Sequence, residues 1–125
     1  MANLELEKLE VYQMAMQLGE KVHDIIVGWD YYYRSTIGKQ LMRSCDSVAA
    51  NISEGYGRYF YKENRNFCFY ARGSLTETKT WIVKASNRNL ISEKDTTILI
   101  REIETMHYKL NNYINSIGRN PNNDQ

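Results

Sequence analysis

The stretch that decides the fold is residues 43–77, RSCDSVAANISEGYGRYFYKENRNFCFYARGSLTE. It begins with five polar side chains spaced four, four, three and four residues apart: Arg43, Ser47, Asn51, Glu54 and Arg58. Beside this polar stripe runs an apolar stripe made of Leu41, Cys45, Val48 and Ile52. Such spacing predicts one amphipathic helix that ends at the glycines 55 and 57, followed by a second helix.

The composition of the whole chain is that of a soluble helical domain. The 125 residues, 42% hydrophobic and 25% charged, are enough for one domain with a single core. Long helices are permitted because the one proline, Pro121, lies near the C-terminus. Because no run is long enough to span a membrane and the first residues are acidic, we expect a cytoplasmic protein. Cys45 and Cys68 lie on apolar faces, where we expect buried, reduced thiols.

The net charge of +1 conceals an uneven distribution along the chain. Residues 34–88 contain ten Lys and Arg against four Asp and Glu, a balance of +6. The remaining residues contain six against eleven, a balance of −5. The middle of the chain is therefore basic and its flanks are acidic, which suggests a surface for a negatively charged partner.

Alternating spacing of three and four residues between apolar positions predicts four helices. We expect them at about residues 7–28, 36–56, 60–89 and 92–117. Between the first two we expect a loop of Asp30 and the tyrosines 31–33, with Ser35 as the N-cap of the second helix. The fourth helix opens at a sequence that resembles a capping box, Ser92 to Asp95.

Four such helices pack most simply as an antiparallel up-down four-helix bundle, whose handedness stays open. We place this single all-α domain at residues 1–118 and a disordered tail at residues 119–125. On the third helix the expected core row is Phe67, Ala71, Ser74, Thr78, Trp81 and Ala85. A second apolar row lies beside it: Cys68, Leu75 and Ile82. This surplus is either the core of an irregular bundle or a subunit interface.

A family pattern lies in the same central stretch. Its positions are Arg43-Ser44, Ser47-Val48, Asn51-Ile52, Glu54-Gly55, Gly57-Arg58, Lys62-Glu63, Phe67, Ala71 to Leu75, and Glu77. In these positions the chain resembles the four-helix-bundle proteins related to those encoded inside the intervening sequences of bacterial 23S ribosomal RNA. The helix layout matches over nearly the whole chain. One departure is the segment Tyr31-Tyr32-Tyr33-Arg34, where the family often has a Phe-Pro pair.

The resemblance implies a small cytoplasmic bundle that assembles as a ring, a homopentamer. It also implies kinship with the accessory bundle of diversity-generating retroelements, which binds nucleic acid and a reverse transcriptase. The family itself has no established biochemical role, and we expect no cofactor.

Cations and aromatic residues around the glycine turn are candidates for nucleic-acid binding. The proposed phosphate contacts are Arg43, Arg58, Lys62, Arg65 and Arg72, and the proposed stacking residues are Tyr56 and Tyr59. Alternatively, the arginines pair with the acidic flanking helices and the tyrosines pack in a core or interface. The chain would then be a purely structural or protein-interaction oligomer.

The remaining polar positions have structural and chemical interpretations. We expect Ser47, Asn51, Glu54 and Glu77 to form a structural network between helices or subunits. A catalytic acid–base role is the alternative. Because no nucleophile with a neighbouring base can be assembled from the spacing, we expect no enzyme.

A metal-binding bundle is a third hypothesis. Glu20-x-x-His23 and Glu104-x-x-His107 have the spacing of di-iron bundles, and Glu77 falls at the same height. At that height, however, the second helix offers Lys39 and Arg43, whose charges repel a cation. We therefore expect no metal, and predict a self-associating bundle that binds structured RNA or a nucleoprotein partner through its basic second and third helices.

Overall fold

The computed structural model describes residues 2–119, with side chains from residue 5 onward. Over this range the chain forms six helices and no strand, so the predicted all-α class is confirmed. They are α1 (Ala2–Lys8), α2 (Glu10–Ile26), α3 (Tyr31–Ser35), α4 (Ile37–Tyr56), α5 (Tyr61–Asn87) and α6 (Glu93–Ser116). None of these helices is long and apolar enough to cross a membrane. Of the predicted tail, residues 120–125 lie outside the described range.

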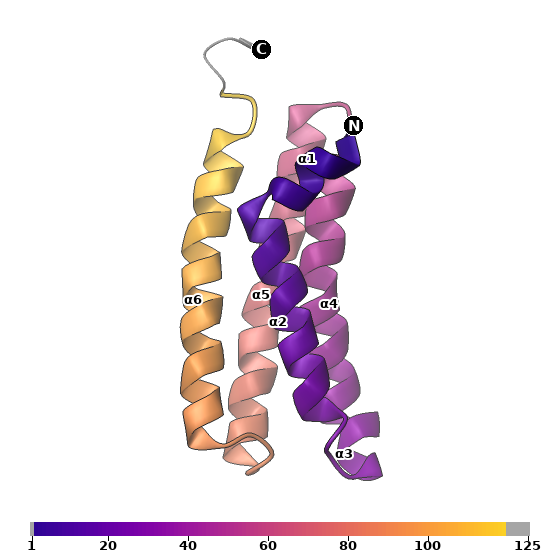
Figure 1. Cartoon of the computed structure of the whole chain (residues 1–125), viewed down its shortest axis with the longest axis vertical. Coiled ribbons are helices and arrows are strands. Elements are labelled where there is room, and N and C mark those ends of the chain that lie inside the picture. Colours follow the sequence, from indigo (N-terminus) through magenta and orange to yellow (C-terminus); the bar gives the residue numbers. More distant parts are fainter. Residues whose placement is uncertain (1, 120–125) are drawn as a thin grey trace.

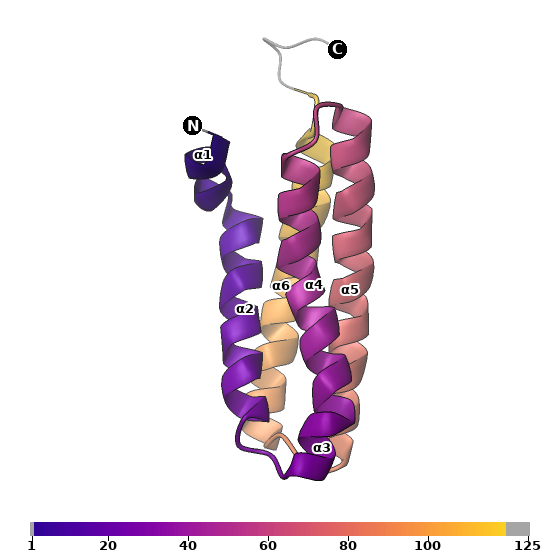
Figure 2. The same cartoon turned by 90° about the vertical axis from the view of Figure 1, so that its right-hand side faces the viewer.

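The four long helices, α2, α4, α5 and α6, lie side by side and alternate in direction (Figures 1 and 2). Contacts join α2 to α4, α4 to α5, α5 to α6, and α6 back to α2, so each long helix has two long neighbours. The turn between α4 and α5 lies at the same end of the molecule as α1 (Figure 1). The short helix α3 and the turn between α5 and α6 lie at the opposite end.

The first predicted helix, residues 7–28, is two helices. Leu9 separates α1 from α2 with an extended backbone, φ −73° and ψ 118°, which lies outside the α-helical region. The Gln13 side chain donates a hydrogen bond across the break to the carbonyl of Glu7 at 2.7 Å. The prediction of one continuous helix was wrong here because the apolar spacing continues through a residue whose backbone is not helical.

The tyrosine-rich segment is a short helix, α3, where a loop was predicted. The predicted N-cap role of Ser35 was also wrong, because Ser35 is the last residue of α3 and its hydroxyl donates to the carbonyl of Tyr32 at 3.1 Å. Thr36 holds the N-cap position of α4. At α6 the prediction is confirmed, since the Ser92 hydroxyl accepts a hydrogen bond from the Asp95 amide at 3.0 Å.

Apolar side chains of the four long helices form one core cluster. The predicted apolar stripe of α4 is confirmed: Leu41, Cys45, Val48 and Ile52 are at most 1% exposed. On α5 the row chosen as core was only partly right. Its partly exposed members are Phe67, Ser74 and Trp81. The fully buried residues include the row that was treated as surplus: Cys68, Leu75 and Ile82. This row is therefore core, which removes it as a candidate subunit interface.

Small side chains close the contact between α4 and α5. The Thr78 hydroxyl donates to Ser44 Oγ, and the Ser74 hydroxyl donates to Ser47 Oγ, both at 3.0 Å. Near the end of α4, a Cβ atom added at Gly55 would lie 2.8 Å from the carbonyl oxygen of Asn64. The two backbones therefore approach so closely at Gly55 that only glycine fits without a shift.

Candidate nucleic-acid interface

The turn between α4 and α5 exposes two aromatic side chains. Tyr59 is 88% exposed and Phe60 is 62% exposed, with ring centroids 4.9 Å apart in an edge-to-face arrangement. The turn is short because α4 ends at Tyr56, and Phe60 already has the extended backbone of the α5 N-cap. Both rings are thus held in solvent at one end of the bundle, where they can stack on unpaired bases.

Two predicted cations belong to the same turn. The Arg58 guanidinium donates to the Glu54 carboxylate at 2.8 Å and lies 4.8 Å from the centroid of the Phe67 ring. Lys62, in the first turn of α5, is exposed and forms no hydrogen bond or ion pair with the described residues. Tyr56 is partly buried, and burial raises the pKa of its hydroxyl, so this group stays protonated at neutral pH.

Arg43 lies apart from this turn. It precedes Arg58 by fifteen residues, which corresponds to about 22 Å along a helix axis. Its side chain is exposed and has no hydrogen-bond or ion-pair partner among residues 5–119. The structure therefore does not bring Arg43 together with the other predicted phosphate contacts.

Arg65 and Arg72 point towards α6. Arg65 Nη1 donates to the carbonyl oxygen of Ile117 at 3.1 Å, and Arg72 Nη1 donates to Asn111 Oδ1 at 2.9 Å. The Arg72 guanidinium also lies 4.9 Å from the centroid of the Phe69 ring. These two predicted cations thus belong to the contact between α5 and α6, next to the turn that carries Arg58.

A further cation, Lys79, was not singled out from the sequence. Its Nζ lies 3.5 Å from the Glu104 carboxylate of α6, on the same side of α5 as Arg65 and Arg72. The overlooked signal is the spacing, because these three cations follow one another at intervals of seven residues. We refer to Arg65, Arg72 and Lys79 as the cationic row.

His107, on α6, lies beside the cationic row. Its Nε2 is 3.1 Å from the Thr76 hydroxyl, across the contact between α5 and α6. Burial, together with the charges of Arg72 and Lys79, lowers the pKa of the imidazole. His107 is therefore neutral at pH 7 in the free protein, and an anion placed nearby would favour its protonated form.

The predicted polar network falls into separate pairs. Asn51 Nδ2 donates to Ser47 Oγ at 2.9 Å, which brings these two predicted residues together. Glu54 instead pairs with Arg58, while the Glu77 carboxylate accepts a hydrogen bond from Trp81 Nε1 at 2.9 Å. Each of these contacts joins residues four apart in the chain, and the link to the neighbouring helix is made by Ser74, which the network did not include.

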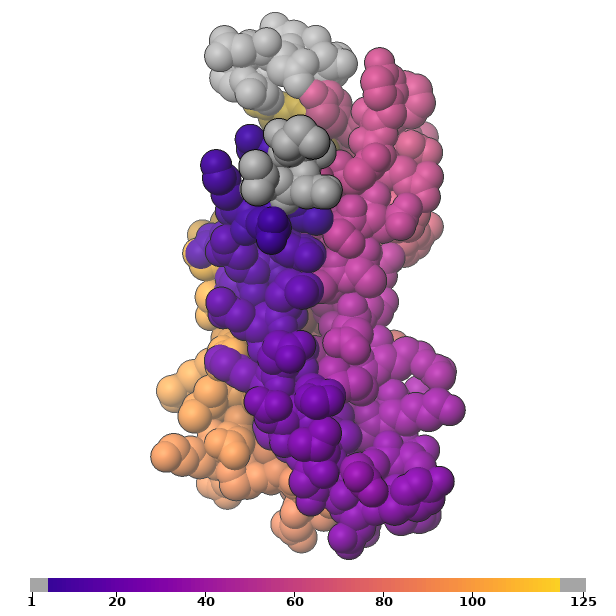
Figure 3. Space-filling view, turned by 45° about the vertical axis from the view of Figure 1, so that its right-hand side comes forward, coloured from indigo at the N-terminus to yellow at the C-terminus, as the bar shows by residue number. Residues whose placement is uncertain are grey.

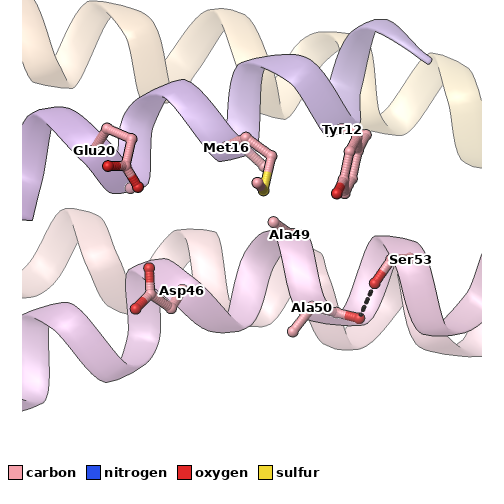
Figure 4. A pocket seen from close by; sticks show the side chains of 9 residues that line it. Tyr12, Met16, Glu20, Asp46, Ala49, Ala50 and Ser53 are labelled. Carbon is pink, nitrogen blue, oxygen red and sulfur yellow. Dashed lines mark hydrogen bonds between the residues drawn. The ribbon is translucent and has the colours of Figure 1, made fainter. Parts of the chain in front are cut away.

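On the other side of α4 lies a groove of about 300 Å³ between α2 and α4, which we call the α2–α4 groove. Figure 3 shows this face of the molecule, and Figure 4 shows the groove from close by. Small residues contribute much of its lining: Ala15, Gly19, Ala49, Ala50 and Ser53. Glu20 and Asp46 face each other across one part of it (Figure 4). Burial and the Glu20 charge raise the pKa of Asp46, so this groove is locally acidic.

The two Glu-x-x-His motifs lie on different sides of the bundle. Glu20 lines the α2–α4 groove, whereas Glu104 pairs with Lys79, and His107 contacts Thr76 between α5 and α6. Among the described residues, no group of three or more His, Cys, Asp or Glu side chains is placed to hold a metal ion.

Comparison with known proteins gives a family and a fold. The model of the family described as 23S rRNA-intervening sequence protein matches residues 7–112. A crystal structure from Bacteroides thetaiotaomicron, a protein of unknown function from the S23 ribosomal protein family, superposes with a TM-score of 0.75 at 16% sequence identity. The alignment covers 83% of this chain and 97% of the other, and at this identity it shows a shared fold. No curated protein matches the sequence.

Proposed function

Since the chain belongs to the 23S rRNA-intervening sequence protein family, we propose that it is a non-enzymatic cytoplasmic protein that binds structured RNA. The interface is the turn between α4 and α5, with Arg58 and Lys62 as phosphate contacts and Tyr59 as a stacking residue. Tyr56 supports this turn from the end of α4. Arg43, about 22 Å away on α4, contacts only an RNA long enough to reach it.

The single observation that carries this proposal is the exposure of the turn. Tyr59 is 88% exposed beside Lys62, whose ammonium has no carboxylate partner in the described part of the chain. Arg58 has a partner, but a solvent-exposed ion pair is weak, so the Arg58 guanidinium can exchange the Glu54 carboxylate for a phosphate. Proteins that recognise RNA sequence-specifically commonly bind unpaired loops and ends, where bases stack on aromatic rings.

The test compares a turn variant with a control of similar chemistry. The turn variant carries Arg58→Ala, Tyr59→Ala and Lys62→Ala. The control changes exposed residues elsewhere: Tyr31→Ala, Lys39→Ala and Lys94→Ala. Fluorescence anisotropy with a labelled RNA hairpin should show that the turn variant binds about tenfold or more weakly, because one stacked base alone contributes about 1–3 kcal/mol. Absence of RNA binding by the unmodified protein at low salt rejects the proposal.

A protein or nucleoprotein partner is the alternative occupant of the same turn. It predicts that one defined partner co-purifies with the unmodified chain and is lost from the turn variant. If that partner is retained after complete nuclease digestion, while purified protein binds no RNA, the function is protein interaction.

We also propose that the chain self-associates, as the ring of five that the family resemblance implies, and that the α2–α4 groove contributes to the contact. Its Ala and Gly lining allows a helix of a second copy to approach closely, and the adjacent Met16 is 47% exposed. Light scattering should give a multiple of the 14.7 kDa chain mass. Ala50→Arg should lower that multiple, whereas Thr105→Arg, on the exposed side of α6, should leave it unchanged. If the unmodified chain is a monomer, the proposal of self-association is overturned.

A further inference from the structure

The cationic row extends the interface along the bundle. Arg65, Arg72 and Lys79 are seven residues apart, close to two helical turns, so each lies about 10 Å beyond the previous one on the same face of α5. The row begins one turn after Lys62, at the end of the bundle that carries the α4–α5 turn. It continues for about 20 Å towards the opposite end.

The partners of the row on α6 hold these cations in place and neutralise only one of them. Arg65 donates to a backbone carbonyl and Arg72 to an amide oxygen, and neither acceptor carries a charge. Lys79 faces a carboxylate, that of Glu104. Each of the two guanidinium groups uses Nη1 for its contact with α6, while the group as a whole carries five N–H donors. The row therefore presents oriented donors with an excess of positive charge.

An aromatic ring borders the row on its solvent side. Phe69 is 42% exposed and already lies under the Arg72 guanidinium at 4.9 Å. A surface that combines spaced cations with an exposed ring suits a single strand, whose phosphates follow the charges while a base stacks. Paired RNA offers no free base face to this ring.

We propose that the contact between α5 and α6 binds an unpaired RNA segment, with phosphates on the cationic row and a base stacked on Phe69. This inference rests on the proposed function, because it continues the same RNA from the α4–α5 turn along the bundle. His107 and Asn111 are neutral hydrogen-bonding groups beside the phosphates. The ligand class is single-stranded RNA, recognised by its backbone charge and by stacking.

The test uses the full chain and an unstructured oligouridine of about 12 nucleotides, within the range of single-strand site sizes. The row variant carries Arg65→Gln, Arg72→Gln and Lys79→Gln. The control variant, Lys8→Gln, Lys39→Gln and Lys94→Gln, removes the same formal charge from exposed positions away from the row. Circular dichroism and thermal unfolding check that all variants remain folded. The dissociation constant is measured as a function of salt concentration for each variant and for the turn variant described above.

The row variant should bind the oligouridine about a hundredfold more weakly than the unmodified chain. Its slope of log K against log salt should be shallower by about 2, because each lost single-strand phosphate contact removes about 0.7. The control variant should change the slope little. If row and control variants weaken binding equally while the turn variant abolishes it, the row inference is overturned and the proposed function stands. If the unmodified chain binds neither oligouridine nor the RNA hairpin, both fail.

A second measurement does not depend on a variant that folds. Photo-crosslinking of a 4-thiouridine oligonucleotide to the unmodified chain, followed by peptide mass spectrometry, should place crosslinks at Phe69. Crosslinks confined to the α4–α5 turn contradict the row. Equal affinity for a blunt RNA duplex, under the same salt conditions, contradicts the requirement for an unpaired segment.

Discussion

The two sides of α5 meet their neighbours in opposite ways. Towards α4, short hydroxyl side chains such as Ser74 and Thr78 bond directly to the serines of the facing helix. Towards α6, long side chains such as Arg72 and Lys79 reach across to their partners. The first contact is buried or partly buried, whereas the Lys79 pair remains substantially exposed to solvent.

The difference means that one side of α5 contributes to folding and the other side contributes to binding. Short side chains let backbones approach closely and leave no space for a ligand, so the α4 side contributes stability and specificity of packing. Long charged side chains in solvent contribute little stability but present donors to an incoming anion.

The largest expected effect is at Gly55, on the α4 side. Gly55→Leu should lower the free energy of unfolding by about 3 kcal/mol, because a Cβ there would lie 2.7 Å from Asn64 Oδ1 and 2.9 Å from Phe67 Cβ. Gly73→Leu is the matched control, since an added Cβ there meets nothing within 4 Å. That substitution should raise stability by about 0.5 kcal/mol through helix propensity. Equal effects of the two in urea unfolding would contradict the close approach of α4 and α5.

The next effect concerns two threonines on opposite sides of α5. Thr78→Val should cost about 1–2 kcal/mol, because it removes a fully buried hydroxyl whose oxygen lies 3.0 Å from Ser44 Oγ and 2.8 Å from the Ser74 carbonyl oxygen. Thr76→Val, on the exposed α6 side, should change stability by no more than about 0.5 kcal/mol. Chemical denaturation of both variants measures the difference. A larger loss of unfolding free energy for Thr76→Val than for Thr78→Val would contradict the difference between the two sides of α5.

A smaller effect is the pH dependence of RNA binding through His107. Its pKa in the free protein is lowered by burial, Arg72 and Lys79, and a bound phosphate should raise it. Affinity should therefore increase about threefold as pH falls from about 8 to 6, because the complex takes up a proton. His107→Gln should remove this increase. His23→Gln should not, since His23 lies beside Asp24 on α2, away from the row.

The same shift predicts an opposite trend for the stability of the free protein. The folded pKa of His107 lies below the unfolded value of 6.5, so the unfolded chain binds more protons as pH falls through that value. The contribution of neutral His107 to stability is thus complete above about pH 6.5 and decreases below it. Thermal unfolding of the unmodified chain and His107→Gln across this range measures the contribution.

The smallest expected effect is on stability at the row itself. Arg72→Gln should change the free energy of unfolding by no more than about 0.5 kcal/mol, because a partly exposed contact with Asn111 contributes little to folding. A loss of about 2 kcal/mol or more would mean that the row holds α5 and α6 together, and the division between the two sides of α5 would fail.

Much of the fold follows from local sequence. The apolar stripe through Cys45 and Ile52 fixed the inner face of α4, and Ser92 marked the start of α6, because both signals depend only on residues within one helix. The break at Leu9 was missed because apolar spacing does not reveal a single non-helical residue. The inner face of α5 was ambiguous because its two adjacent apolar rows fit helical spacing equally well.

The candidate site was less accessible to sequence reasoning. Arg58 and Lys62 were found because they follow the glycine turn in the chain. The roles of Lys79, His107 and Asn111 depend on which face of α6 meets α5, and spacing within either helix does not set that. The seven-residue spacing of the cations indicates only that they share one face of α5. It does not reveal which residues they contact on the neighbouring helix.

The arrangement of the chain ends bears on how the protein is handled. Both α1 and the end of α6 lie at the same end of the bundle as the α4–α5 turn (Figure 1), so an affinity tag joined to either helix would share that end with Tyr59 and Lys62. Tags should be cleaved before ligands are screened. A reporter dye belongs at the far end of the bundle, where exposed Lys94 lies in the first turn of α6. Lys94→Cys would label selectively, because the native thiols of Cys45 and Cys68 are buried.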